Sequence, residues 1–369
     1  MFRIRIQNKK KCIWYCSAVV SFLLFLLLLG WTNHLANTQD AQQMAGRWSE
    51  KKDVAQISCF FSSKAEVTED TIQSFEYSLK NVLQEASITE TSENPSARLW
   101  VDAYSADGKI TLVNGKNTLD ANAIGIGGDF FMFHPLKLIT GAYFSGNDLM
   151  QDYCIIDQDA AWQLFGSNDV VGMTVYIGNV PHIVTGMDKA AGLNSTVVYV
   201  SYETLSAYGT NNGINHYEIV MPNPVDEFAY GKVKEGIGID EKNVEIVENS
   251  RRYSLPNRIK TILAFGTRSM NGKAIIYPYW ENLARGYEDI IALLTVFMLL
   301  LSLYPVVTVI WCFVHWWRHK GWTLKDVWHT GKDQAAGCGT PQGEKALPQG
   351  EGCPGGTGTG AGGRPLCRQ

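Results

Sequence analysis

Histidine, cysteine and carboxylate side chains could bind metals or perform acid–base chemistry, so their spacing is the first feature to consider. The chain has 7 histidines, and no pair of them stands in an HExxH pattern. His315 and His319 are four residues apart and would share a helix face, which favours packing at a membrane interface over a metal site. The sequence therefore predicts neither a metal nor a cofactor. The histidines are His34, His134, His182, His216, His315, His319 and His329.

The other candidates for catalysis are explained better by structural roles. Asp152, Asp157 and Asp159 form an acidic cluster, in which Asp157 is placed to cap a short helix and the other two suit a solvated surface. Gly125-x-Gly127-Gly128 is too short for a dinucleotide fingerprint and suits a turn. No GxSxG serine, no activated cysteine and no GxxxxGK[ST] phosphate loop is present. We therefore expect a protein that is not an enzyme.

Charge and cysteine usage indicate a membrane setting rather than nucleic acid. The formal net charge is -4, but the first dozen residues are basic and the stretch 32–285 is acidic. Cys59 and Cys154 are the two cysteines of the central segment. They favour two buried free thiols, although a disulfide is open if this segment lies outside the cell.

Two long uncharged runs set the organisation of the chain. Residues 13–31 nearly match the length that a helix needs to cross hydrocarbon, and this favours a retained anchor over a cleaved signal peptide. Residues 290–314 form the second run, with tryptophans and basic residues after it. By the positive-inside rule, residues 1–12 and the basic-aromatic segment 315–330 lie in the cytoplasm, and residues 32–289 lie outside. The protein is thus predicted at the cell membrane, in contact with the lipid bilayer.

The outer segment predicts an α+β domain. Strand–helix–strand patterns at both of its ends indicate an α/β subdomain, and the glycine-rich stretch 124–200 indicates an inserted β-rich subdomain. Hairpin turns are expected at Asp107-Gly108, Asn114-Gly115 and Gly178-Asn179.

The basic group Arg251, Arg252, Arg258 and Lys260 suits a solvated face, or else a contact with acidic lipid headgroups or a partner subunit. Residues 331–369 are Gly/Pro-rich and predict disorder; their abrupt onset also resembles a truncated or frame-shifted end.

The middle stretch resembles the MacB-type periplasmic core domain of ABC-transporter permeases of the MacB/FtsX class. The resemblance is carried by a series of glycines, aromatic residues and aspartates whose order and spacing match. Each of them suits a scaffold role, in a turn, a helix end or the core. They are Gly128, Asp129, Phe130, Phe131, Gly141, Phe144, Asp148, Asp157, Ala161, Leu164, Phe165, Gly166, Gly172 and Gly186.

The resemblance implies a non-catalytic permease-type subunit. In that class, ATP hydrolysis in the cytoplasm is coupled through membrane helices to movement of the outer domain, so a separate ATP-binding cassette ATPase is the expected partner, with a second permease subunit possible. Such permeases usually have four membrane helices, whereas this sequence shows two. The alternative is a stand-alone cell-surface binding or scaffolding module without transport activity.

Overall fold

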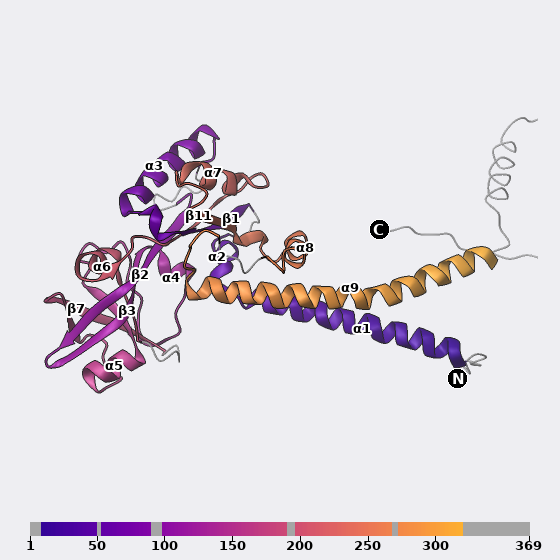
Figure 1. The fold of residues 1–369 in the computed structure, drawn as a ribbon, viewed down its shortest axis with the longest axis horizontal. Coiled ribbons are helices and arrows are strands. Elements are labelled where there is room, and N and C mark those ends of the chain that lie inside the picture. The colour runs from indigo at the N-terminus through magenta and orange to yellow at the C-terminus, as the bar shows by residue number, and fades with distance from the viewer. Residues whose placement is uncertain (1–8, 50–52, 90–97, 190–195, 268–271, 320–369) are drawn as a thin grey trace, which may run out of the picture. The chain divides into compact units, whose positions relative to one another are not determined.

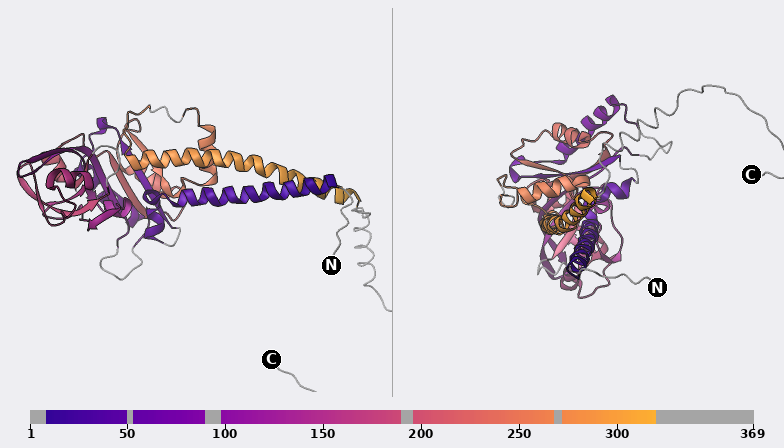
Figure 2. Two further views of the ribbon diagram at one scale, coloured as in Figure 1. Left: turned by 90° about the horizontal axis from the view of Figure 1, so that it is seen from below. Right: turned by 90° about the vertical axis from the view of Figure 1, so that its right-hand side faces the viewer.

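The computed structural model describes residues 9–49, 53–89, 98–189, 196–267 and 272–319 (Figures 1 and 2). The predictions for residues 1–8, for the tail 331–369 and for most of the segment 315–330 lie outside these residues. The chain divides into two compact units, Met1–Thr308 and Val309–Gln369, which are described separately.

The helices alternate with strands along the chain. The helices are α1 (Lys9–Asn37), α2 (Met44–Trp48), α3 (Glu69–Glu85), α4 (Phe130–Phe133), α5 (Gln158–Phe165), α6 (Tyr202–Tyr208), α7 (Phe228–Gly236), α8 (Leu255–Leu263) and α9 (Tyr279–His319). The strands are β1 (Val54–Phe61), β2 (Val101–Asn114), β3 (Asn117–Gly128), β4 (Leu138–Gly141), β5 (Tyr153–Asp157), β6 (Thr174–Ile177), β7 (Val180–Asp188), β8 (Val197–Ser201), β9 (Thr210–Asn211), β10 (His216–Pro222) and β11 (Val244–Glu248).

One sheet runs through the whole domain in the order β11-β1-β10-β2-β3-β8-β5-β7-β4. Its β-rich end closes on itself, because β6 pairs with both β2 and β7. The strands β2, β3, β8, β5, β7 and β6 therefore form a closed ring around an apolar core that α5 and α6 also line. Closure pairs each of these strands on both sides over part of its length, which shortens the edges open to another chain.

The long β2–β3 hairpin connects this ring to the rest of the sheet. Its outer half contributes Ile110, Leu112 and Leu119 to the core of the ring, while the first residues of β2 pair with β10. Within the stretch 124–200, β5, α5, β6, β7 and β8 lie in this closed part together with the outer halves of β2 and β3, whereas α4 packs in a separate core. An α+β domain with a β-rich part, between two apolar helices, is what the sequence indicated, and this fold class is confirmed.

The strands β1 and β10 have two faces of different chemistry. Alternate side chains, including Ile57, Cys59, Tyr217 and Ile219, pack under α3 and α7, which cover one face (Figure 1). Because successive strand residues point to opposite faces, the side chains between them project to the other face. These are Gln56, Ser58, Phe60, His216 and Glu218, all of them buried.

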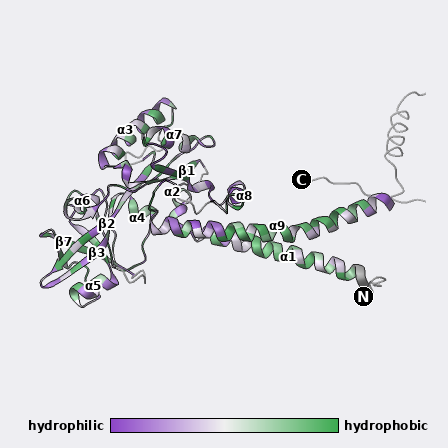
Figure 3. Cartoon of the chain, viewed as in Figure 1, coloured by the Kyte–Doolittle hydropathy of each residue, from purple (hydrophilic) through white to green (hydrophobic). Residues whose placement is uncertain are grey.

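The helices α1 and α9 are long and apolar enough to cross a membrane, judged by length and composition (Figure 3). They contact one another through polar groups: the Ser17 hydroxyl lies 2.7 Å from that of Tyr304, and Ser21 Oγ donates to the Leu301 carbonyl at 2.8 Å. In hydrocarbon such hydrogen bonds face no competition from water. The helix α9 begins at Tyr279, well before the apolar run, and continues without interruption into it.

One predicted turn is wrong. β2 runs straight through Asp107-Gly108, with Gly108 paired to Ala123, and the hairpin turns instead at Gly115, where φ is +60°. The glycine at 108 is required by packing: a Cβ there would lie 2.3 Å from the Thr210 carbonyl oxygen. The turns at Asn114-Gly115 and Gly178-Asn179 are confirmed.

Cys59 and Cys154 are buried free thiols in different cores, as favoured above.

The neighbouring carboxyl groups of Glu76, on α3, and Asp102, on β2, predict a pH-dependent stability. Burial, and then the nearby Asp102 carboxylate, raise the pKa of Glu76 to about 8 from 4.5. Between these pH values the folded state holds a proton that the unfolded state has lost, so the free energy of unfolding falls as pH rises. Urea unfolding of Glu76→Gln across this range should show a weaker pH dependence. Glu85→Gln, at the exposed end of the same helix, is the control and should keep the wild-type slope.

Candidate functional site

The polar face of the sheet is the place where charged side chains gather out of contact with water. His216 and Glu218 lie two residues apart on β10 and therefore point to the same side. Across the sheet, Glu218 is paired with Ser58 of β1, whose Oγ donates a hydrogen bond to Glu218 Oε1. His216 is paired with Ser105 of β2, with Ser105 Oγ 3.4 Å from His216 Nδ1. The strand register thus explains both contacts.

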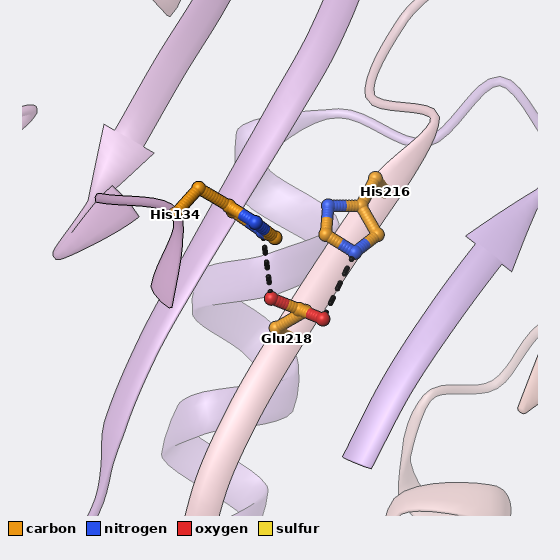
Figure 4. A group of neighbouring side chains, drawn as sticks. All are labelled: His134, His216 and Glu218. Atoms are coloured by element: carbon orange, nitrogen blue, oxygen red, sulfur yellow. Dashed lines mark ion pairs between the residues drawn. The ribbon is translucent and has the colours of Figure 1, made fainter. Parts of the chain in front are cut away.

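His134 approaches the same carboxylate from the end of α4 (Figure 4). Its Nε2 lies 2.8 Å from Glu218 Oε2, and His216 Nε2 lies 3.4 Å from Glu218 Oε1. In both cases the oxygen is off the direction required for a hydrogen bond. Aromatic rings enclose the group: Trp280 of α9 lies 4.2 Å from the His134 ring, and Phe60 stacks on His216 at 5.1 Å, centroid to centroid.

Burial and proximity set the ionisation of this group. Burial lowers the pKa of His134 below its usual value, so its imidazole is neutral at neutral pH. Burial alone would raise the pKa of Glu218, but the two imidazoles beside it bring that pKa well below the usual range. Glu218 is therefore an ionised carboxylate in an almost fully buried position.

A chain of hydrogen bonds leads from this carboxylate to α9. Asn249, in the short 3-10 helix Asn249–Arg251, donates to Ser58 Oγ at 2.6 Å and accepts from Arg252 at 3.0 Å. The Arg252 guanidinium, with only 2% of its side chain exposed, donates to both oxygens of Glu281 at 2.7 Å each and also bonds Glu288. Burial alone would lower the pKa of Arg252, but the Glu281 carboxylate raises it, so the charge is held.

A second arginine extends the network to the edge strand. Arg285 donates to Glu281 at 2.7 Å and to Glu245 of β11 at 2.6 Å. Tyr277 donates to the other oxygen of Glu245 at 2.5 Å, and the Arg285 guanidinium lies over the Tyr277 ring at 3.9 Å. Glu281, Arg285 and Glu288 are four and three residues apart, so they share one face of α9.

The ion pairs that Arg252 and Arg285 form with Glu281, Glu288 and Glu245 are called the joint below, because they attach α9 to the sheet side of the domain. Each of these charges is matched by an opposite charge, and displacing one side would leave a charge buried without a partner. The first turns of α9 are therefore held in one position on the sheet. A displacement of α9 would carry the sheet with it, or else break several buried interactions together.

The residues that carry the family resemblance lie elsewhere, in the cores and turns. Phe130, Phe131 and Phe144 are buried in the core between α4 and the sheet, and Ala161 and Leu164 in the core of the closed ring, against which Phe165 packs. Gly128, Gly141, Gly166 and Gly172 have positive φ, and a Cβ on Gly186 would lie 3.0 Å from the Ala142 carbonyl oxygen. Their role as a family motif remains a prediction.

The three aspartates of that set have separate local roles. Asp157 caps α5, as expected: one oxygen accepts from the Ala160 N–H at 2.7 Å, and the other from the Val197 N–H at 2.9 Å. Asp129 precedes α4 and pairs with Arg98 at 2.5 Å. The Asp148 N–H donates to the Ser145 carbonyl at 3.2 Å.

Sequence reasoning missed both the joint and the group around Glu218. The interpretation of Arg252 as part of a solvated basic face is wrong, because its guanidinium is buried and paired with Glu281 and Glu288. Arg251 instead pairs with Asp226 and Glu248. The spacing of Glu281, Arg285 and Glu288 on one helix face was the available signal. For His134 and His216, which are far apart in the chain, the sequence offered no comparable signal.

Comparisons with known proteins agree on one relationship. A family model described as "MacB-like periplasmic core domain" matches residues 23–246. The macrolide export ATP-binding/permease protein MacB of Chromobacterium violaceum is 32% identical over 95 residues, covering 24% of this chain and 15% of that protein. Its counterpart from Neisseria gonorrhoeae is 35% identical over 81 residues, covering 21% and 13%. The chain's match thus spans only about a seventh of these relatives' length.

Solved structures of extracytoplasmic domains are also similar. The extracellular domain of the noncanonic ABC-type transporter YknZ from Gram-positive bacteria is 20% identical, with a TM-score of 0.36, and the match covers 52% of this chain and 99% of that one. The periplasmic region of MacB from Actinobacillus actinomycetemcomitans is 19% identical, with a TM-score of 0.37, and the match covers 59% and 94%.

The cap by Asp157 predicts a local loss of stability. Asp157→Ala removes the acceptor for two backbone N–H groups, so we expect the free energy of unfolding to fall by about 1–3 kcal/mol. Asp159→Ala, in the exposed first turn of the same helix, should change it by less than about 0.5 kcal/mol. Urea unfolding of the full chain in detergent measures both; equal effects would contradict the capping role.

The buried guanidinium predicts a larger effect. Arg252→Met leaves Glu281 buried with one cation fewer, so the free energy of unfolding should fall by about 3–5 kcal/mol. Arg258→Met is the matched control, because Arg258 is partly exposed and, within the described residues, donates to the Tyr253 carbonyl without an ion pair; we expect about 1 kcal/mol there. The double variant Arg252→Met/Glu281→Gln should regain part of the loss. Similar losses for Arg252→Met and Arg258→Met would refute a buried joint.

Proposed function

The chain belongs to the family of the MacB-like periplasmic core domain, which confirms the resemblance above, and from this we propose a non-catalytic permease-type subunit. Its outer domain would transmit movement between the membrane helices and a partner or substrate outside. The observation that carries this proposal is the attachment of α9 to the sheet through Arg252, Glu281 and Arg285. A mechanical connection requires such a joint, and enzymatic chemistry does not.

The family and the two apolar helices that flank the domain fit a membrane protein with an extracytoplasmic domain. The direction of the helices is our proposal: both termini lie in the cytoplasm. It is supported by Arg3, Arg5 and Lys9–Lys11 before the first apolar run and by Arg318 and Lys320 after the second. Acidic residues have little influence on orientation, so these basic clusters are the relevant signal.

The first helix is also connected to the sheet, which supports transmission through both helices. Gln56 of β1 is fully buried; its Nε2 donates to the Ala41 carbonyl at 2.7 Å, and its Oε1 accepts from the Met44 N–H at 2.8 Å. Gln43 donates to the Ala36 carbonyl in the last turn of α1 at 2.8 Å. Both apolar helices thus end in hydrogen-bonded contacts on the domain side.

A separate ATP-binding cassette ATPase is the partner that this proposal requires. The curated relatives are named as ATP-binding/permease proteins, and this chain has no GxxxxGK[ST] phosphate loop. The ATPase would contact the cytoplasmic side, and a second permease subunit could complete the membrane part. The outer domain would then respond to the nucleotide state through α1 and α9.

The proposal predicts a nucleotide-dependent outer domain. The full chain, extracted in mild detergent, should co-purify with an ATP-binding cassette protein, and adding ATP with vanadate should change its limited-proteolysis pattern. Arg252→Met/Glu281→Met removes both charges of the main ion pair, so less charge is left uncompensated. This variant should still co-purify with the ATPase but lose the nucleotide-dependent change.

Arg258→Met is the control, with both properties expected to remain. A nucleotide-dependent change that persists in the double variant would contradict coupling through this joint. Repeated recovery of the chain without any ATPase would instead favour the stand-alone binding module.

One feature supports that second candidate: an open hollow of about 550 Å³, partly lined by Tyr143, Phe144 and Asp148, lies beside the exposed Leu149 and Met150.

A further inference from the structure

The group formed by His134, His216 and Glu218 has the composition of a metal-binding site. Each residue offers one donor atom, and these atoms all lie within 4.8 Å of one another. Figure 4 shows both imidazole rings directed at the same carboxylate from different elements, His134 from the end of α4 and His216 from β10. Two imidazoles and one carboxylate form a donor set that proteins use for Zn²⁺ and related ions.

The donors of this group lack the hydrogen bonds that buried polar atoms normally have. Within the described part of the chain, neither ring nitrogen of His134 has a hydrogen-bond partner, and the same holds for His216 Nε2 and Glu218 Oε2. All three side chains are at least 95% buried. Most buried polar atoms in native proteins have a partner, so several orphaned atoms pointing at one spot call for an explanation.

The ion pairs around Glu218 also favour a cation at this position. Glu218 forms its described ion pairs only with the two histidines, while Arg252 and Arg285 are engaged by Glu281, Glu288 and Glu245. Among the described residues, no lysine or arginine lies within ion-pair distance of the Glu218 carboxylate. A bound divalent cation would place a positive charge against this carboxylate and would give one nitrogen of each histidine a partner at the same time.

We propose that His134, His216 and Glu218 bind one divalent transition-metal ion of the Zn²⁺ class at a structural site. The ion would connect the end of α4 to β10 directly beneath Trp280, the first large residue of α9 in the core. It would therefore brace the sheet where α9 begins. The aromatic surround of Phe60, Phe130 and Trp280 suits a closed site rather than one open to substrate.

The test uses the full chain in mild detergent, purified without a histidine tag. His315 and His319 are replaced by alanine in every protein, because their rings lie 4.1 Å apart on an exposed helix face and could bind metal themselves. After chelation and dialysis, Zn²⁺ is added, excess is removed, and bound zinc is measured by elemental analysis. We expect about one equivalent per chain, retained on gel filtration.

His134→Asn and His216→Asn should each lose that equivalent. His182→Asn is the matched control, because His182 is equally buried but lies against Thr204 and the Val180 carbonyl, and this variant should keep the zinc. Absence of stoichiometric zinc in the parent protein would overturn the proposal and favour an imidazolium–carboxylate pair. Zinc that persists in both cluster variants would overturn it equally.

A measurement on the parent protein keeps the test valid if the variants do not fold. X-ray absorption at the zinc edge should show only nitrogen and oxygen ligands at about 2.0–2.2 Å, with the outer-shell scattering of two imidazoles. Sulfur ligands, or a shell without imidazole, would place the metal elsewhere and reject the site. Chelation should also lower the thermal unfolding temperature, and added Zn²⁺ should restore it, through binding to the folded state alone.

Discussion

A guanidinium group withdrawn from water is the constraint on which much of this structure depends. Arg252 is almost completely buried, and a charge in such a place is tolerated only with opposite charges and well-directed hydrogen bonds around it. Glu281 and Glu288 supply them from α9, and Asn249 supplies one from the side of the sheet. The helix and the sheet therefore meet in one register, which loosely matched apolar surfaces would not specify as tightly.

The sheet supports this joint through the alternation of its strands. On β1 and β10, one set of side chains builds the apolar core under α3 and α7, and the other set carries Ser58, His216 and Glu218. The same two strands thus stabilise the α/β layer and present polar groups to α9. Farther along, the shared β2–β3 hairpin extends this order into the closed ring, so the two parts of the domain are continuous.

Much of the fold could be predicted from local signals. Uncharged runs of sufficient length indicated both apolar helices, Asp157 and Gly166 marked the two ends of α5, and Gly178-Asn179 marked a hairpin. Each of these depends on residues close together in the chain. The prediction was wrong at Asp107-Gly108, because a glycine needed for the close approach of Thr210 has the same sequence appearance as one needed for a turn. Only the packed structure separates the two cases.

For the candidate site, too, local sequence signals and tertiary contacts contributed different parts. By itself, the sequence determined the two long apolar helices, the α+β class and the family resemblance, since hydropathy, turn residues and motif spacing are properties of neighbouring residues. Only the tertiary structure decided that Arg252 is buried against α9 and that His134 and His216 meet at Glu218. Such contacts join residues from separate elements, and strand register and helix docking bring them together. A residue's type shows which partners it can take, but the fold decides which partner it reaches.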